Sequence, residues 1–215
     1  PTAEHTGLRF FIQAPFDVPV DRERITYDSA WNLWLLSRVP SVWRALIARV
    51  LQQTPQHHKK LAGHSLLNVL PLQTELGAPI YKIITDGLPA ALADAAFLPC
   101  RGDKMERAAS VVIVSPTLAF LEDGAFNARF LEGQQDSPQL PPRSVFVPPT
   151  QHGKRAEEVA VALGALRLDE RTLIDRLEAA LKNLPNGSKP PGDWLPACVR
   201  TPDPEGFTHL LKTFE

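Results

Sequence analysis

The sequence predicts an α+β fold, in which mixed short strands and a hairpin pack with several amphipathic helices and the C-terminal part is rich in helix. Two short apolar runs, residues 8–12 and 111–114, have the length and composition typical of strands. Apolar side chains recur every three or four residues after Ser29 and again after Asp169, as in helices with one buried face. Residues 101–103 read Arg-Gly-Asp, a combination typical of a turn.

The first apolar run places apolar side chains on both sides of an extended chain. Every second side chain in residues 8–12 is apolar, and Phe11 adds an apolar side chain on the opposite face. This pattern suits a strand covered on both sides, although a run this short also fits a buried helix. Pro15 and Pro19 exclude a helix over residues 16–20 and favour an edge strand or an extended arm there.

Two helices are expected to follow this run. Asp28 or Ser29 can cap the first helix, which Pro40 is expected to interrupt, and Ser41 is expected to start the second. The side chains expected to face inward are Trp31, Trp34, Leu35 and Val39 in the first helix and Val42, Trp43, Leu46, Ile47, Val50 and Leu51 in the second.

The middle of the chain predicts one more helix and a hairpin. Pro79 is suited to the start of a helix that Pro89 is expected to break or kink. Residues 97–100 are expected to form a short strand, and the Arg-Gly-Asp turn at 101–103 is interpreted as a hairpin turn rather than as an adhesion motif. The β-branched residues 111–114 predict a further strand.

A proline-rich stretch suggests how the chain is divided. Residues 134–152 are rich in proline and glutamine, contain serine and follow directly after Gly133, which predicts a linker. It would separate an α/β segment at 1–133 from a helical C-terminal subdomain at 153–215. A single strand is expected within the linker at 145–147, and an alanine-rich helix is expected at 154–163.

Composition excludes several classes of protein. The net charge of -1, from 23 basic and 24 acidic residues, gives no electrostatic basis for binding nucleic acid. No apolar run has the length needed to span a bilayer. Two cysteines, Cys100 and Cys198, are too few for a disulfide framework, so free thiols in a reducing compartment and a cytoplasmic location are expected.

Two stretches carry a resemblance to a known family. One is an apolar run followed by Arg-Glu-x-Ile and then by Asp-Ser-x-Trp-Asn-x-x-Leu-Leu, and the other covers residues 66–72 and 95–113. Together they resemble the sacsin and NO VEIN class of large proteins over roughly the first half of the chain. The residues that match the first motif are Phe16, Arg22, Glu23, Ile25, Asp28, Ser29, Trp31, Asn32, Leu35 and Leu36.

In that class this segment follows an ATPase domain of the GHKL type, the fold of the ninety-kilodalton heat-shock chaperone, gyrase and histidine kinases. The resemblance implies a non-catalytic fragment that couples ATP binding and hydrolysis in an N-terminal ATPase domain to conformational change in a chaperone-like or defence-type protein. ATP and Mg would belong to that domain, because the Asp-x-Gly-x-Gly box and the glycine-rich lid are absent here. Implied partners are the ATPase domain and protein clients.

The start of the chain agrees with this expectation. The sequence begins at Pro1, and its only methionine is Met105. We therefore expect the chain to begin within a longer protein. The chain alone is not expected to be an enzyme, whereas the parent protein is expected to be an ATPase.

The resemblance also supplies a candidate catalytic residue. In the chaperone branch of the GHKL enzymes, an arginine in a Ser-Arg-Glu turn outside the nucleotide domain reaches the γ-phosphate of ATP. This implies the same role for Arg22, with Arg24 as a second candidate for contact with the nucleotide. A guanidinium is always charged, and its planar fork matches phosphate oxygens. Asp21 stands where the family has a small polar residue, and its carboxylate would neutralise Arg22 internally.

An alternative interpretation gives the chain no nucleotide role. Arg22 and Arg24 would then be surface charges paired with neighbouring carboxylates, and the chain would be a protein–protein interaction or scaffold module. The first hypothesis requires an exposed Arg22, whereas the second favours an Arg22 held in ion pairs. No metal site is predicted, because the spacing of His57, His58 and His64 does not suit shared coordination.

Overall fold

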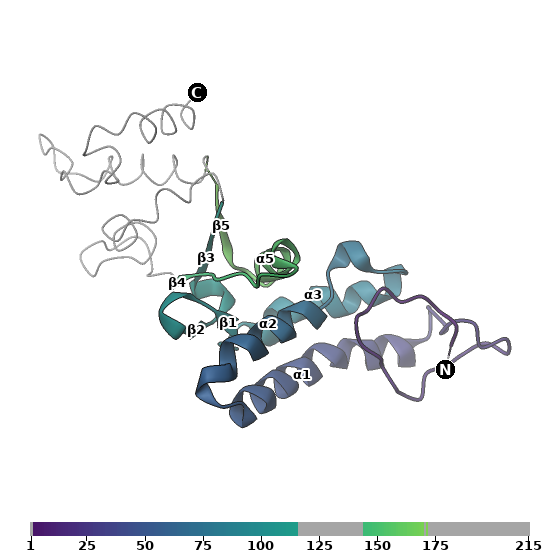
Figure 1. Ribbon diagram of the computed structural model, residues 1–215. Helices are drawn as coiled ribbons and strands as arrows, with labels where there is room; N and C mark the ends of the chain where they lie inside the picture. The colour runs from purple at the N-terminus through teal and green to yellow at the C-terminus, as the bar shows by residue number, and fades with distance from the viewer. Residues whose placement is uncertain (1, 116–143, 170, 172–215) are drawn as a thin grey trace, which may run out of the picture. The chain divides into compact units, whose positions relative to one another are not determined.

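The chain is described by a computed structural model, which describes residues 2–115, 144–169 and 171 (Figure 1). It comprises two compact units, one formed by Pro1–Ala109 with Val147–Ala165 and the other by Ser110–Phe146 with Leu166–Glu215. The first unit combines α-helices with a small antiparallel hairpin, and the second contains a parallel sheet. The predicted α+β class is therefore confirmed.

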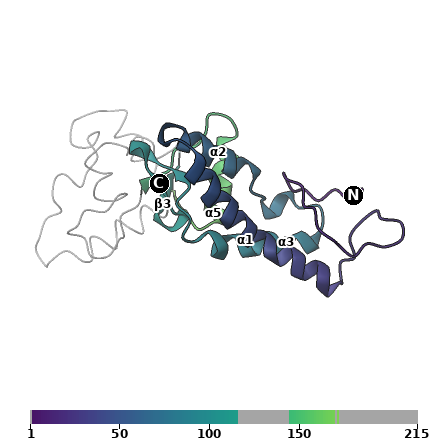
Figure 2. The ribbon, with the colours of Figure 1, turned by 90° about the horizontal axis from the view of Figure 1, so that it is seen from below.

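Helix α1, Ala30–Gln53, is the longest element of the first unit (Figure 2). Ser29 caps it as predicted, with its hydroxyl accepting a 3.4 Å hydrogen bond from the Asn32 amide. Trp31 and Trp34, which were expected to face inward, are 44% and 46% exposed. The stripe that α1 buries consists of Asn32, Leu36, Pro40, Trp43 and Ile47, of which Trp43 and Ile47 were expected to face inward.

Pro40 does not interrupt α1, so the prediction of two separate helices is wrong. A proline inside a helix removes one backbone hydrogen bond, which costs about 3 kcal/mol when nothing compensates. Here Pro40 is buried against Gly87 of helix α3, Lys82–Leu92, and a Cβ at Gly87 would lie 2.8 Å from the Pro40 Cγ. Close packing between the two helices therefore stabilises the uninterrupted helix.

Helix α3 begins as predicted and continues past Pro89. The 3-10 turn Pro79–Tyr81 leads directly into it, with Pro79 at the first position. Pro89 lies inside α3, which continues to Leu92, so Pro89 does not end the helix. The remaining 3-10 turns of the described chain are Gln56–His58, Gln73–Glu75, Arg101–Asp103 and Ala108–Ser110.

Helix α5, Gly153–Ala162, packs against helix α2, Lys59–Val69, within the first unit. Its position confirms the helix predicted at 154–163. The expected division placed this helix in a separate C-terminal subdomain at 153–215, but α5 is buried with the helices of the first unit through Ala156, Val159 and Ala160. Most of the remaining subdomain, and residues 134–143 of the expected linker, lie outside the described residues.

The hairpin of the first unit forms where it was predicted. Strand β1, Leu98–Pro99, pairs antiparallel with β2, Met105–Glu106, around the Arg-Gly-Asp turn. Gly102 has a φ of 67°, which glycine adopts without steric cost. Cys100 is fully buried beside this turn, and burial raises the pKa of its thiol to about 12. The Cys100 thiol is therefore protonated and unreactive at neutral pH. The second cysteine, Cys198, lies outside the described residues.

The second unit contains a parallel sheet of strand order β4-β3-β5. Strand β3, Val111–Val114, is the predicted β-branched strand and lies in the centre. On one side it pairs with β4, Ser144–Val145, which is shorter than the strand expected at 145–147, and on the other with β5, Leu166–Leu168, which was not predicted. Val111 and Val112 are fully buried, as expected for a central parallel strand.

Candidate functional site in the loop before helix α1

The residues expected to form the first strand bend at residues 9–10 and are not paired as a strand with any described residue. No strand is assigned within residues 2–29, so the prediction of a strand at 8–12 is wrong for this structure. A strand needs backbone hydrogen bonds to a neighbouring strand, and residues 8–12 form none to another segment of the described chain. The nearest such bond is at Thr6, whose carbonyl accepts from the Gly77 amide at 3.0 Å. The arm runs instead as an irregular loop beside the start of α1 (Figure 1). Phe10 packs edge-on against Trp43, with ring centroids 5.1 Å apart.

Asn32 fixes the base of the loop that carries Arg22. This fully buried side chain accepts a 2.8 Å hydrogen bond from the Asp17 amide through Oδ1. Through Nδ2 it donates to the carbonyls of Asp17 and Thr26, at 2.8 and 2.9 Å. The Thr26 amide also donates to the Asp17 carbonyl at 2.9 Å. Residues 17 and 26 are thereby held together, and the loop between them is closed at its base.

Arg22 lies at the tip of this closed loop. Its amide donates a 3.0 Å hydrogen bond to the Pro19 carbonyl, and its φ of 55° is uncommon for a residue other than glycine. The neighbouring Asp21 carboxylate accepts a 3.2 Å hydrogen bond from the Glu23 amide. The exposed Arg22 guanidinium has no ion pair or hydrogen bond to any residue that the structure describes. Asp21 therefore does not neutralise it in the way the sequence suggested.

Arg24 has a different environment from Arg22. Its guanidinium carbon lies 5.5 Å from the centroid of the Tyr27 ring, within the range of a cation–π contact. The Tyr27 hydroxyl in turn donates a 2.5 Å hydrogen bond to the Glu4 carboxylate, which raises the pKa of Tyr27 together with burial. Glu4 also accepts a 3.2 Å hydrogen bond from the Ile25 amide. The structure thus places Arg24 on an aromatic face and leaves Arg22 exposed, with no ion pair or hydrogen bond from its guanidinium to the described residues.

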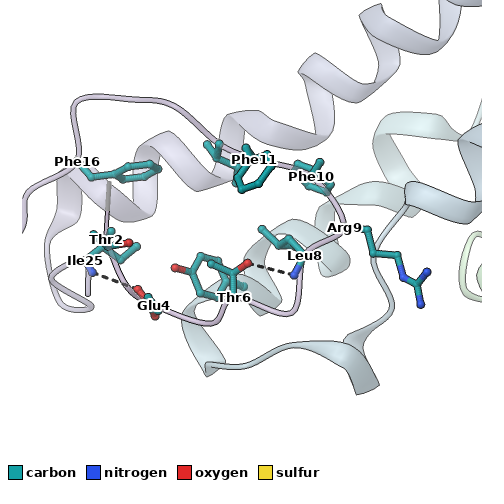
Figure 3. Close-up of a pocket in the computed structure, with 11 residues that line it drawn as sticks. Thr2, Glu4, Thr6, Leu8, Arg9, Phe10, Phe11, Phe16 and Ile25 are labelled. Atoms are coloured by element: carbon teal, nitrogen blue, oxygen red, sulfur yellow. Dashed lines mark hydrogen bonds between the residues drawn. The ribbon is translucent and has the colours of Figure 1, made fainter. Parts of the chain in front are cut away.

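A cavity of about 490 Å³ lies next to the loop, inside the curve of the N-terminal arm (Figure 3). Neither Arg22 nor Arg24 lines it. In Figure 3, Phe10, Phe11 and Phe16 lie along one side and Thr2, Glu4, Thr6 and Leu8 along the other, and Arg9 points away. Tyr81 also lines the cavity, and burial with the nearby Glu4 carboxylate raises the pKa of its hydroxyl. The cavity is thus partly apolar and contains one acidic group and no candidate phosphate ligand except Arg9.

Several residues of this region were not assigned a role from the sequence. Glu4 and Tyr81 are isolated in the sequence, and no spacing signal links them to residues 25–27. The sequence analysis named Asn32 only as a residue of the family motif, although the sequence also contains an indication of its structural role. It continues the helical stripe of Leu36, Pro40 and Ile47, so a polar residue stands on a buried face and requires hydrogen-bond partners.

The histidines of the polar stretch before and within α2 do not converge. The ring centroids of His57 and His58 lie 4.1 Å apart. The Nε2 atom of His64 is instead hydrogen-bonded to the Val147 carbonyl at 2.9 Å. Within the described ranges, no group of three or more histidine, cysteine, aspartate or glutamate side chains is arranged to hold a metal ion. No helix in those ranges has both the length and the apolar character to cross a membrane.

Comparison with known proteins gives no further assignment of this site. No protein-family model, no curated protein and no solved structure matches the chain.

Proposed function

We propose that this chain is a non-catalytic accessory segment of a GHKL-type ATPase of the sacsin class. It would couple ATP binding and hydrolysis in a neighbouring domain of the same polypeptide to conformational change in a chaperone-like or defence-type protein. ATP and Mg belong to the neighbouring domain, and Arg22 is the contact with the γ-phosphate. The free Cys100 thiol supports a cytoplasmic location for the protein, because free thiols persist in reducing compartments.

The observation that carries this proposal is the unpaired guanidinium of Arg22. An arginine already engaged by carboxylates would lose those interactions before it could contact a phosphate. The Arg22 side chain is exposed and has no such partner among the described residues. It can therefore approach the nucleotide of a neighbour without first breaking an ion pair. A bidentate guanidinium then stabilises the charge that spreads over the phosphoryl oxygens in the transition state.

The closed base of the loop supports the same role. Catalysis by an external charge requires that the charge be positioned before reaction, because ordering a loose loop costs conformational entropy. Asn32 joins residues 17 and 26 through three hydrogen bonds of 2.8–2.9 Å. The loop is thus anchored to α1, and movement of α1 would move Arg22. This connection is the physical route by which nucleotide state and conformation would be coupled.

The test is ATP hydrolysis by the polypeptide as its gene encodes it. Arg22→Ala is expected to lower kcat by roughly a hundredfold or more while changing the Kd for ATP by less than about threefold, because the guanidinium acts mainly in the transition state. Arg22→Lys is expected to recover only part of the rate, since an ammonium keeps the charge but not the planar fork.

Arg24→Ala is the matched control. This arginine lies two residues away on the same exposed loop, but its guanidinium contacts the Tyr27 ring. Its loss should change kcat by less than about threefold, in keeping with a surface cation. Equal losses of kcat in Arg22→Ala and Arg24→Ala would mean that the total positive charge of the loop matters, and not a specific contact of Arg22 with phosphate. Unchanged turnover in Arg22→Ala, or no ATP hydrolysis in the wild type, would remove the nucleotide role.

A second candidate function is a protein–protein interaction module without a nucleotide role. It is favoured by the exposed aromatic pair Trp31 and Trp34, whose rings stack with centroids 5.0 Å apart and planes inclined by 17°. Arg38 lies over the Trp34 ring at 5.2 Å. Aromatic and arginine side chains of this kind are enriched in protein interfaces. Under this function, Trp34→Ser would abolish association with the partner, and Arg22→Ala would leave both association and ATP turnover unchanged.

A further inference from the structure

Part of the N-terminal arm, residues 9–13, has backbone groups without a hydrogen-bond partner among the described residues. Across residues 9–13, neither an amide nor a carbonyl forms a hydrogen bond with any residue that the structure describes. The nearest backbone bonds lie outside this stretch, from the Leu8 amide to the Thr6 hydroxyl at 3.1 Å and from the Phe16 amide to the Ala14 carbonyl at 2.9 Å. Five consecutive residues therefore present their donors and acceptors to the surroundings.

The side chains of the same stretch alternate strictly. Leu8, Phe10 and Ile12 are half-buried, whereas Arg9, Phe11 and Gln13 are exposed. This period of two is the pattern of a β-strand. Phe11 is fully exposed at the open side of the cavity that it lines, with a relative exposure of 104%, so the run presents a large apolar side chain to its surroundings.

The unpaired backbone groups and the alternating side chains together indicate what kind of partner residues 9–13 are suited to bind. Loops lie on the surface, where water satisfies their backbone groups, and large apolar side chains are disfavoured there because their exposure to water is unfavourable. An apolar alternating run with free amides and carbonyls is instead suited to pair with another strand, in which main-chain hydrogen bonds supply affinity and alternate side chains supply specificity. The inward face of the run is already covered, since Phe10 packs on Trp43 of α1.

We propose that residues 9–13 form a strand by adding to the exposed edge of a β-sheet in the neighbouring domain of the same polypeptide. The identity of that domain rests on the proposed function. Its sheet must carry an apolar layer on one side, because Phe11 becomes buried there on pairing. The bend at residues 9–10 straightens as the strand forms.

A pre-existing sheet is favoured over a second copy of this chain as the partner. Two copies that paired through their arms would join only five residues each and would form a two-stranded ribbon, which is marginally stable in water. An existing sheet already holds its edge strand in position, so only the arm loses conformational freedom. The apolar side chains on both faces of the run also suit a covered sheet rather than an exposed ribbon.

Hydrogen exchange of the arm amides tests this proposal. In the polypeptide as its gene encodes it, amides of alternate residues within 9–13 are expected to exchange about 100-fold more slowly than in the 215-residue chain alone. Alternation is the signature of pairing along one edge, because successive amides of a strand point to opposite sides. Uniformly fast exchange of all five amides in the polypeptide would overturn the proposal.

Substitutions at exposed apolar side chains separate pairing from general stability. Phe11→Glu is expected to abolish the slow exchange, while the thermal midpoint of the 215-residue chain stays unchanged because Phe11 is exposed there. Leu61→Glu, at a residue of α2 that is 65% exposed, is the matched control and should leave the slow exchange intact. Equal loss of slow exchange in both variants would refute the proposal.

Two further outcomes identify which partner causes any slow exchange of the amides of residues 9–13. Slow exchange that appears in the 215-residue chain alone and grows with its concentration would mean pairing between copies, which contradicts the proposal. Arg22→Ala is expected to leave the slow exchange in place. Strand addition with no effect of Arg22→Ala on ATP turnover would therefore refute the proposed function while supporting the paired strand.

Discussion

Arg155 shows how one side chain can determine local stability. Its guanidinium donates to both oxygens of the Glu75 carboxylate, at 2.6 Å each, and to the carbonyls of Leu67, Asn68 and Leu70, at 2.7–3.0 Å. These carbonyls lie at the C-terminal end of α2, where a helix leaves its last acceptors unpaired. Arg155 is only 11% exposed, so its removal leaves buried acceptors without donors.

We predict that Arg155→Ala lowers the free energy of unfolding by about 3 kcal/mol, the magnitude typical of breaking a buried pair from one side. Lys154→Ala is the matched control, because Lys154 is exposed and neighbours Arg155 on the same helix. Its effect should stay below about 0.5 kcal/mol. Urea denaturation at neutral pH measures both values, and similar losses in the two variants would contradict the role given to Arg155.

The same pair predicts a dependence of stability on pH. The hydrogen bonds from Arg155 hold the pKa of Glu75 below its ordinary value of 4.5. A carboxyl whose pKa is lowered by folding stabilises the protein fully above its unfolded pKa, and this contribution is lost as the pH falls through the folded value. We expect Glu75→Gln to destabilise the protein at pH 7 and the difference from wild type to shrink below pH 4.5. Urea denaturation between pH 7 and pH 3 checks this, and a constant difference would be inconsistent with it.

Among the helices, the contact between α1 and α3 determines how the first unit packs. Pro40 and Gly87 meet at this contact, and the absence of a Cβ at Gly87 provides the space for the proline ring. A proline in the middle of a helix is interpreted from sequence as an interruption, because the sequence does not display its partner. The helix continues here because the partner helix accommodates the ring.

We predict that Gly87→Ala destabilises the protein by about 1–2 kcal/mol, because the ring of Pro40 cannot move aside cheaply. The double variant with Pro40→Ala should recover part of this loss, giving a coupling energy of about 1 kcal/mol in a double-mutant cycle. Gly153→Ala is the control, since a Cβ there would lie 3.4 Å from its nearest neighbour, Pro148. Strict additivity of Pro40→Ala and Gly87→Ala would contradict the proposed close contact.

At the scale of the whole molecule, sequence order and spatial grouping differ. Residues 147–165 follow the proline-rich stretch in sequence, yet they complete the first unit through α5. We predict that a chain ending at residue 146 loses cooperative unfolding or melts at least about 10 °C lower than one ending at residue 169, because Arg155 and the buried face of α5 are gone. Thermal unfolding followed by circular dichroism decides this. Equal melting temperatures would support an independent C-terminal subdomain.

Local sequence patterns were sufficient to predict several elements of the fold. The Ser29 cap, the start of α3 at Pro79, the turn at Gly102 and the strand β3 follow from side-chain chemistry within a few residues. The prediction of a strand at 8–12 was wrong because a strand depends on non-local contacts. It forms only where another chain segment supplies hydrogen bonds. Of the candidate site, the sequence indicated Arg22 and Arg24. It did not indicate that Asn32 anchors their loop or that Asp21 accepts from the Glu23 amide and forms no ion pair with Arg22.

The sequence by itself determined the α+β class, most local starts and turns, and the arginine whose role is proposed here. These properties depend on the conformational preferences of individual residues and on the period of apolar side chains. The tertiary structure alone decided that α1 continues through Pro40, that α5 belongs with α2, and that the Arg22 guanidinium forms no ion pair or hydrogen bond within the described part of the chain. Each of these depends on which distant groups come into contact, and a free energy of contact cannot be assigned before the partner is known.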